Sequence, residues 1–271
     1  MNEIDQKVLN FYEKLPFNIY GDIDNACKNI RKFDLKKVYP FLFDSISKSK
    51  TIIDVGCGGG WLVNSIAYKF DKDIYGVDFN PVAINFAKKV TSKMSNKVSY
   101  EVKNIFDYTP SLKFDLILSM GVLHHTHDCL LALDKICKFG KKNSMIYVGL
   151  YHKYGRKPFL EFVETIKGLP EEESFEEYKK IHKLEDELHL KSWFRDQVLH
   201  PHESLHGLEE VLRIFKKNGY EFTGTSINSF KQTDTISEIL RKEKDLYEYG
   251  KKKIQSKIYY PGFFIVGGIK K

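Results

Sequence analysis

The sequence predicts an α/β fold in which helices cover both faces of a mostly parallel, doubly wound sheet of seven strands. Strand-like and helix-like segments alternate from Thr51 onward, which is the pattern of parallel strands joined by crossover helices. In addition, a glycine-rich turn at Asp54–Gly60 leads the first strand directly into a helix. We expect strands near residues 51–55, 73–77, 97–103, 114–120, 143–150, 220–227 and 257–268. Gly262, inside the last of these segments, is expected to mark a bulge.

The helices between these strands are predicted from apolar spacing and from end signals. Apolar residues recur at helical spacing in residues 62–70 and 83–90. The pair Asn80–Pro81 is a typical helix start, because an N-cap side chain is followed by a proline in the first turn. Another apolar stripe covers residues 208–215, and Gly219 is expected to end that helix.

The turn after the first strand indicates a ligand pocket. Backbone N–H groups and the positive end of a helix converge at such a turn, and glycines keep side chains away from the ligand. A dinucleotide fingerprint would need its third glycine at the position of Trp61. Gly56, Gly58 and Gly60 instead occupy every second position after Asp54. With this pattern the chain resembles the class I S-adenosylmethionine (SAM)-dependent methyltransferases.

A second acidic residue supports this resemblance. Asp78 ends the next strand roughly 20 residues further on, where a carboxylate that accepts from both ribose hydroxyls is expected. Phe79 and Asn80 follow it, so no basic residue is available for a ribose phosphate. The resemblance implies a seven-stranded sheet with an antiparallel last strand, SAM as cofactor and S-adenosylhomocysteine (SAH) as product. It also implies that Asp54 faces the amino group of the methionine moiety.

The resemblance implies further cofactor contacts after the third and fourth strands. Asn104 would bind the adenine amino group through its oxygen, Ile105 would give a backbone contact, and Ile105 or Phe106 would pack on the adenine face. Met120 and Val122 would line the sulfonium end. The expected cofactor-binding residues are Tyr12, Asp54, Gly56, Gly58, Gly60, Trp61, Asp78, Phe79, Asn80, Asn104, Ile105, Phe106, Met120 and Val122.

Two histidines follow the fourth strand, where the resemblance implies that the methyl acceptor arrives. A histidine with a pKa near neutrality is a suitable base for an acceptor hydroxyl, so His124 and His125 are catalytic candidates. The alternative for each of them is a hydrogen bond to the following helix or loop.

The N-terminal segment Phe11–Gly21 is aromatic without helical regularity, which suggests a cap over a flat ligand. Tyr12, Asn18 and Tyr20 offer polar tips to that ligand. We expect Phe11 and Phe17 to pack against the sheet instead.

The segment after the fifth strand is a second candidate for the acceptor site. Arg156 follows Tyr151 and Tyr154, and its guanidinium is suited to hold a carboxylate or phosphate with two parallel hydrogen bonds. The acceptor-site candidates from the whole chain are His124, His125, Tyr20, Tyr151, Tyr154, Arg156, Arg195, His200 and Glu203.

The same segment closes with an R-D-x-x-x-H-x-x-E motif at Arg195–Glu203, which resembles a segment of loosely characterised bacterial methyltransferases. We expect Arg195 and Asp196 to form an ion pair that shapes the cavity, and His200 and Glu203 to face the acceptor or fix the lid. The histidines in residues 200–206 also have a spacing compatible with a metal site. No metal is expected, because methyl transfer from a sulfonium needs no Lewis acid.

Three segments do not belong to the predicted sheet. Residues 1–50 form an N-terminal cap segment, and residues 151–205 form an inserted lid and acceptor-site segment. Between them, residues 51–150 form the SAM-binding core. Residues 206–271 complete the core and include a helical insertion near residues 230–255. Insertions at the carboxyl ends of strands lie above the ligand crevice of an open α/β sheet, so we expect these segments to form a helical cap or lid over the site.

Composition and charge restrict the partners. The 43 Lys and Arg residues exceed the 36 Asp and Glu residues by a net charge of +7, but they are spread along the chain and form no basic stripe with interleaved aromatic residues. We therefore expect no nucleic-acid partner. The four cysteines show no C-x-x-C spacing, no apolar run approaches the ~18 residues of a membrane span, and the N-terminus lacks a signal peptide's apolar core. A cytoplasmic protein without a membrane partner is expected.

The predicted function is transfer of the SAM methyl group to a small-molecule acceptor. One alternative is a methyltransferase of the same fold that acts on tRNA or protein, for which the net charge of +7 is the argument. Another is a SAM-binding module without catalysis. A nicotinamide dehydrogenase is disfavoured by Trp61 in the glycine turn.

Overall fold

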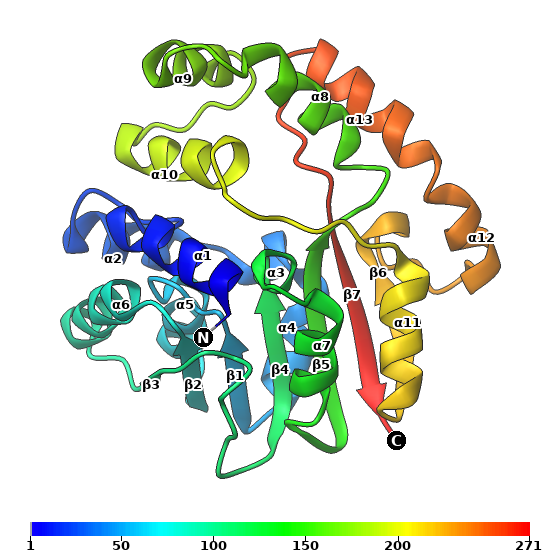
Figure 1. Ribbon diagram of the computed structural model, residues 1–271. Coiled ribbons are helices and arrows are strands. Elements are labelled where there is room, and N and C mark those ends of the chain that lie inside the picture. Colours follow the sequence, from blue (N-terminus) through cyan, green and yellow to red (C-terminus); the bar gives the residue numbers. More distant parts are fainter. Residues whose placement is uncertain (1) are drawn as a thin grey trace.

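The computed structural model describes residues 2–271 and contains a seven-stranded sheet with helices on both faces (Figure 1). The strands are β1 (Thr51–Val55), β2 (Asp73–Asp78), β3 (Ser99–Val102), β4 (Phe114–Met120), β5 (Gly140–Tyr151), β6 (Tyr220–Thr225) and β7 (Phe263–Lys270). Their order is β3-β2-β1-β4-β5-β7-β6. Strand β7 runs antiparallel to β5 and β6, whereas the pairs from β3 to β5 are parallel. The predicted fold class and antiparallel last strand are confirmed.

Helices precede the sheet, connect its strands and extend its insertions. They are α1 (Glu3–Lys14), α2 (Ile23–Lys32), α3 (Leu35–Val38), α4 (Pro40–Lys48), α5 (Trp61–Lys69), α6 (Pro81–Met94), α7 (Cys129–Cys137), α8 (Lys157–Ile166), α9 (Glu171–Lys179), α10 (Glu187–Val198), α11 (Leu208–Lys217), α12 (Ile236–Lys242) and α13 (Asp245–Gln255), with short 3-10 helices η1 (Leu123–His125) and η2 (Ser226–Asn228). The Asn80 side chain caps α6 by accepting from Val82 N–H, as its sequence predicts.

The sheet separates two apolar cores because successive side chains of a strand point to opposite faces. Ile53 of β1 lies in the core shared with α7 and α11. Its neighbour Ile52 lies in the core shared with α3, α4 and α5. Both isoleucines are fully buried, so β1 is central and covered on both faces.

Three helical segments lie above the carboxyl ends of the parallel strands (Figure 1). They are α1 of the N-terminal segment, the insertion that contains α8, α9 and α10, and the pair α12 and α13. Helix α13 packs against α8, which connects the last two of these segments. The strand order reverses between β1 and β4, and a ligand crevice in an open α/β sheet lies at that reversal.

The expectation of a bulge at Gly262 is wrong. Gly262 precedes β7, and the register shift between β6 and β7 lies at Phe222 and Gly224. Gly262 has a φ of +70°, and a Cβ there would lie 2.2 Å from the backbone nitrogen of Arg156. A glycine is needed at this position because two backbone segments meet there.

Within residues 2–271, no helix combines the length and the apolar character needed to cross a membrane. The four cysteines are buried free thiols.

Candidate active site

The carboxyl ends of β1, β2 and β4 form one wall of a cavity of about 520 Å³. Thirteen of the fourteen predicted cofactor-binding residues line this cavity, and the exception is Gly60. Among the predicted acceptor-site residues, His125, Tyr20 and Tyr151 line it. The remaining six, His124, Tyr154, Arg156, Arg195, His200 and Glu203, are not part of its wall.

The glycine turn is held against β2 by hydrogen bonds. The Gly56 N–H donates to the Val77 carbonyl (2.7 Å), the Gly58 N–H donates to Asp78 Oδ2 (2.8 Å), and the Asn80 N–H donates to Asp78 Oδ1 (2.9 Å). Burial raises the pKa of the Asp78 carboxyl group, and these backbone N–H groups counteract the rise. Because each carboxylate oxygen has two lone pairs, Asp78 can still accept from hydroxyl groups in the cavity.

Two glycines of the turn meet different requirements. Gly58 has a φ of +51°, and a Cβ there would meet no protein atom within 4 Å, so this part of the turn faces open space. Gly56 has a φ of +79°, and a Cβ there would lie 2.3 Å from a methyl carbon of Val122. The turn therefore approaches the loop after β4 at Gly56 and leaves room for a ligand at Gly58.

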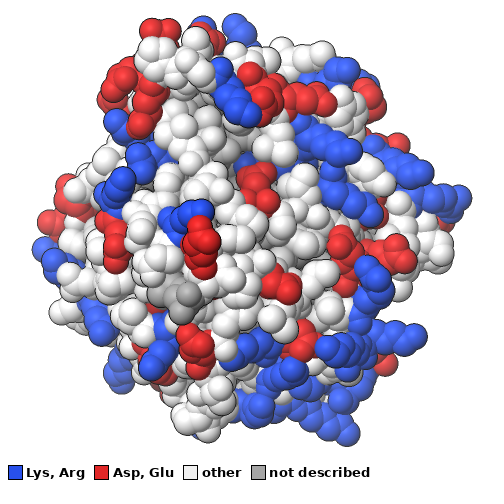
Figure 2. Space-filling model, viewed as in Figure 1, with Lys and Arg blue, Asp and Glu red and all other residues white. Residues whose placement is uncertain are grey.

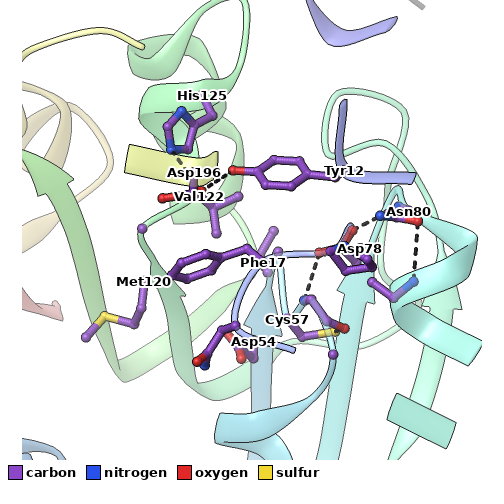
Figure 3. A pocket seen from close by; sticks show the side chains of 18 of the residues that line it. Tyr12, Phe17, Asp54, Cys57, Asp78, Asn80, Met120, Val122, His125 and Asp196 are labelled. Carbon is purple, nitrogen blue, oxygen red and sulfur yellow. Dashed lines mark hydrogen bonds and ion pairs between the residues drawn. The ribbon is translucent and has the colours of Figure 1, made fainter. Parts of the chain in front are cut away.

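Asp54 lies at the bottom of the cavity in Figure 3 and is 4% exposed. Burial, and after it the charge of Asp78, raises the pKa of Asp54 to about 7. Within residues 2–271, no protein group donates a hydrogen bond to this carboxylate. A buried acceptor without a partner favours a ligand that brings donors. The ammonium group of a methionine moiety would supply them, so the residues present fit SAM at this end.

The adenine candidates lie at the rim after β3, where Asn104 is held by protein partners. Its Oδ1 accepts from the Phe106 N–H (2.9 Å), and its Nδ2 donates to Asp5 Oδ2 (3.2 Å). Asp5 also accepts from the backbone N–H of His127 (3.0 Å) and lines the cavity. The sequence analysis does not identify Asp5, because an aspartate in the first turn of a helix is commonplace.

The middle of the cavity lies between Met120, Val122 and Phe17 (Figure 3). The Phe17 ring packs edge-on against Trp193 of α10, at 4.9 Å between ring centroids. Phe11 packs against His200, at 5.2 Å. The expectation that Phe11 and Phe17 pack against the sheet is therefore wrong, because both rings contact the insertion.

At the other end of the cavity, α1 meets α10. The Tyr12 hydroxyl donates to Asp196 Oδ1 (2.5 Å), and Gln197 Nε2 donates to Asp196 Oδ2 (2.6 Å) and to the Tyr151 hydroxyl (2.5 Å). Burial raises the pKa of Asp196 to about 6, against the lowering effect of these hydrogen bonds. The expected ion pair between Arg195 and Asp196 is not formed. Asp196 instead presents its carboxylate to the cavity.

His125 faces this carboxylate. Its Nε2 lies 3.9 Å from Asp196 Oδ1 (Figure 3). Its Nδ1 lies 2.9 Å from the carbonyl oxygen of His202. Burial lowers the pKa of His125 to about 4, so the ring is neutral at neutral pH.

His124 and His200 lie behind His125, outside the cavity wall. His124 is fully buried and its ring lies 4.0 Å from that of Tyr151. The His200 ring lies 3.7 Å from that of His125. Burial lowers the pKa of both residues, so both rings are neutral. They support the rings that line the cavity.

Arg156 is a buried structural centre. Its guanidinium donates to both carboxylate oxygens of Glu203 (3.0 and 2.7 Å), to Gln197 Oε1 (2.8 Å) and to the Pro261 carbonyl (3.2 Å). It also stacks on the Tyr151 ring at 3.8 Å. Arg156 and Glu203 thus hold the lid segment against the residues that precede β7. Neither side chain is directed to the cavity, so the acceptor-site role expected from the sequence is not supported.

Tyr154 and Arg195 also lie outside the cavity wall. The Tyr154 N–H donates to His152 Nδ1 (3.2 Å) in the turn after β5. The Arg195 guanidinium lies 3.8 Å from Glu171 and over the ring of Phe11.

The inner face of the lid contributes cavity residues that the sequence analysis does not propose. They come from α10, from the segment before β7 and from the first residue of β7, and they are His189, Trp193, Gln197, Tyr259, Pro261 and Phe263. The Trp193 indole donates to His189 Nε2 (2.9 Å), and the Tyr20 ring lies 4.3 Å from that of His189. The predicted lid segment was the available signal, but nothing in it distinguishes an inner from an outer face.

Each histidine in residues 200–206 has its own hydrogen-bond contact, and their rings do not converge on a common centre. His202 Nε2 lies 3.1 Å from the Thr126 carbonyl, and His206 Nε2 lies 2.8 Å from Ser204 Oγ. In the part of the chain that the structure describes, no group of three or more His, Cys, Asp or Glu side chains is arranged to hold a metal ion.

Comparisons with known proteins agree with this architecture. Residues 46–174 match the family model described as "Methyltransferase domain". The chain is 28% identical over 110 residues to the ubiquinone biosynthesis O-methyltransferase of Pelagibacter ubique. This alignment covers 41% of the present chain and 45% of the relative. The chain is also 24% identical over 192 residues to the tRNA U34 carboxymethyltransferase of Campylobacter fetus, which covers 62% and 66%.

Among solved structures, the magnesium protoporphyrin IX methyltransferase of Synechocystis with bound SAH matches with a TM-score of 0.52 at 13% identity. This match covers 100% of the present chain and 88% of the other. The curated matches span less of their proteins, for example 45%, 61% and 64% of three relatives.

The sheet order, the antiparallel β7 and the matched domain define the class of the protein. Residues 46–174 are a methyltransferase domain, and the whole chain has the sheet order and the antiparallel last strand of the class I SAM-dependent methyltransferase fold. The domain match and a structural neighbour of the same fold with bound SAH confirm the resemblance seen in the sequence and its cofactor, SAM.

Proposed function

We propose that this chain transfers the methyl group of SAM to a small-molecule acceptor held between α1 and α10. The observation that carries the proposal is the continuity of the cavity. A single space of about 520 Å³ is lined by Asp54 and Asp78 at one end and by Asp196 and His125 at the other. A cofactor and an acceptor can therefore meet inside one enclosure.

We assign the cofactor end by the donors and acceptors in its wall. Asp78 would hold the ribose hydroxyls, and Asp54 would hold the ammonium group. Asn104 and Asp5 would hold the adenine amino group. Bound SAM supplies a methyl group on a sulfonium sulfur. Met120 and Val122 line the intervening stretch, where apolar contacts exclude water.

The acceptor end would act mainly by positioning. In-line displacement requires the acceptor atom to lie opposite the bond that breaks, and fixing this geometry removes much of the entropic barrier. The rings of Tyr12, Phe17 and Trp193 would confine the acceptor. His125, with a pKa of about 4, is a weak base, so we assign it the role of accepting a hydrogen bond that orients the acceptor.

A methyltransferase acting on tRNA is a second candidate, since one relative carries that name and the net charge is +7. Figure 2 shows lysines and arginines along the upper right, over α12 and α13, and gathered again towards the lower right, over α11 and the ends of β5 and β7. The exposed lysines there include Lys138, Lys141, Lys142, Lys216, Lys217 and Lys271. They lie at the amino ends of the parallel strands, whereas the cavity lies at the carboxyl ends. This separation of the lower-right group from the cavity favours the small-molecule acceptor.

Calorimetry with SAH tests the cofactor end. We expect Asp78→Ala and Gly58→Ala to weaken SAH binding by at least about tenfold, equal to about 1.4 kcal/mol. Asp73→Ala on the same strand and Gly168→Ala are matched controls. Gly168 shares a positive φ (+89°) and open space at its Cβ but lies away from the cavity. Unchanged SAH affinity in both site variants would overturn the assignment.

Methyl-labelled SAM tests the acceptor class. The protein would be incubated with a metabolite extract or with total tRNA, and the label would be followed in each fraction. Label in the small-molecule fraction supports the proposal. Label in the tRNA would replace the proposed function with the second candidate. SAH binding without any transfer would indicate a non-catalytic SAM-binding module.

A further inference from the structure

Two hydrogen-bond acceptors face each other at the α1–α10 end of the cavity. Asp196 Oδ1 and His125 Nε2 lie 3.9 Å apart, on side chains that are 5% and 4% exposed. In the part of the chain that is described, His125 Nε2 has no hydrogen-bond partner. His125 lines the cavity, but Nε2 itself is enclosed by its neighbours, so a ligand reaches it only when the surrounding side chains shift. Because buried polar atoms are almost always paired, this unpaired atom indicates a missing donor.

The tautomer of His125 follows from its other nitrogen. The His202 carbonyl oxygen can only accept, so the ring hydrogen must lie on Nδ1 at 2.9 Å from it. Nε2 then presents a lone pair towards the Asp196 carboxylate. Asp196 Oδ1 accepts one hydrogen bond from the Tyr12 hydroxyl (2.5 Å) and has a second lone pair. Two electron-rich groups at this distance repel each other unless a further group with hydrogens stands between them.

The charge of Arg156 lowers the pKa of Asp196, but no cationic side chain in residues 2–271 is ion-paired with this carboxylate. The guanidinium of Arg156 is bound to Glu203. Aromatic rings flank the pair instead. The His125 ring lies 6.5 Å from that of Tyr12 and 5.7 Å from that of Tyr151, between ring centroids. Electron-rich rings beside a carboxylate favour a cationic ligand.

We infer that the acceptor carries a primary or secondary amine that binds between Asp196 and His125. This inference rests on the proposed function and specifies its substrate class. A nitrogen about 2.9 Å from each of the two atoms spans their separation and donates a hydrogen to both. A hydroxyl group has one hydrogen and satisfies only one of them. A carboxylate has none and is repelled by Asp196.

Matched probes test the inference without any variant. SAH-saturated protein would be titrated calorimetrically with benzylamine, benzyl alcohol and benzoate, and then with hexylamine, hexanol and hexanoate. We expect each amine to bind at least about tenfold more tightly than its alcohol, and each carboxylate to bind more weakly still. Failure of both amines to bind, or tighter binding of a carboxylate, would overturn the inference.

Asp196→Asn tests the residue itself, because asparagine keeps the size of the side chain and removes its charge. We expect the affinity for the amines to fall at least about tenfold while SAH affinity stays within about threefold. Glu173→Gln, an exposed carboxylate change on α9, is the control and should alter neither affinity. Equal amine binding by Asp196→Asn and wild type would contradict the inference. Loss of SAH binding by wild-type protein would instead refute the proposed function, so the two failures are distinguishable.

Discussion

The hydroxyl group of Tyr12 donates a 2.5 Å hydrogen bond to Asp196, and the two residues are 184 positions apart in the chain. This contact joins α1 of the N-terminal segment to α10 of the insertion, directly over the cavity (Figure 3). The N-terminal segment and the insertion therefore cover this end of the cavity together, because this hydrogen bond joins them.

Tyr12→Phe should loosen this closure. A hydrogen bond to a charged group contributes about 1.5–3 kcal/mol, so we expect amide hydrogen exchange in residues 3–14 to accelerate by roughly tenfold or more. Exchange in β1 and β4 should not change. Mass spectrometry of the exchange measures both regions. Tyr68→Phe, which alters a half-exposed tyrosine of α5, is the control. Equal protection of α1 in wild type and Tyr12→Phe would contradict the prediction.

Asp54→Asn should change how stability depends on pH. The pKa of Asp54 rises from 3.8 to about 7 on folding, so the folded state binds this proton more tightly than the unfolded state. The stability of the protein without ligand therefore falls as pH rises from about 4 to about 7, by on the order of 4 kcal/mol from this group. Asparagine removes this loss.

Urea unfolding at several pH values measures the effect. We expect Asp54→Asn to exceed wild type in unfolding free energy near about pH 8 and to approach it near about pH 4. The variant should also bind SAH more weakly, because the carboxylate proposed to hold the ammonium group is gone. Asp24→Asn, at an exposed site on α2, should follow the wild-type curve. Parallel curves for Asp54→Asn and wild type would show that Asp54 does not titrate as described.

Arg156→Met should destabilise the fold rather than the acceptor site. Removing the guanidinium leaves the Glu203 carboxylate, which is 17% exposed, without its cation, and breaking a buried pair in this way costs about 3–5 kcal/mol. Urea unfolding measures this loss, and Arg213→Met on the exposed face of α11 is the control. The folded fraction should retain its SAH affinity. An unchanged unfolding free energy together with lost binding of carboxylate or phosphate acceptors would restore the clamp role expected from the sequence.

The fold was predictable because its signals are local. The strand-like segments, the glycine turn and the Asn80 cap each depend on neighbours in the chain, and the sheet follows once such units alternate. The start of β7 at Phe263 was less predictable. Residues 257–262 have strand-like composition, but Gly262 must bring the chain against the backbone of Arg156.

The two ends of the cavity differ in how far sequence reasoning reaches. The cofactor end is built from turns that directly follow strands, so the chain order itself indicates which residues gather there. At the acceptor end, partners come from distant segments. The sequence pairs Asp196 with its neighbour Arg195, whereas Asp196 accepts from Tyr12. The sequence also predicts a ligand clamp at Arg156, because its partner Glu203 lies 47 positions away and the pairing is not visible in the chain order. Spacing along the chain carries no signal for such pairs.

This difference affects how readily each end of the cavity opens to solvent. The turn at Gly58 and the Asp78 carboxylate are 20 residues apart and are fixed by adjacent parallel strands, whereas the α1–α10 wall depends on an N-terminal helix outside the sheet. Fraying of α1 would expose one compartment to solvent and leave the other assembled. Under the proposed function, opening of α1 would give the acceptor access to its end of the cavity while Gly58 and Asp78 still hold the cofactor.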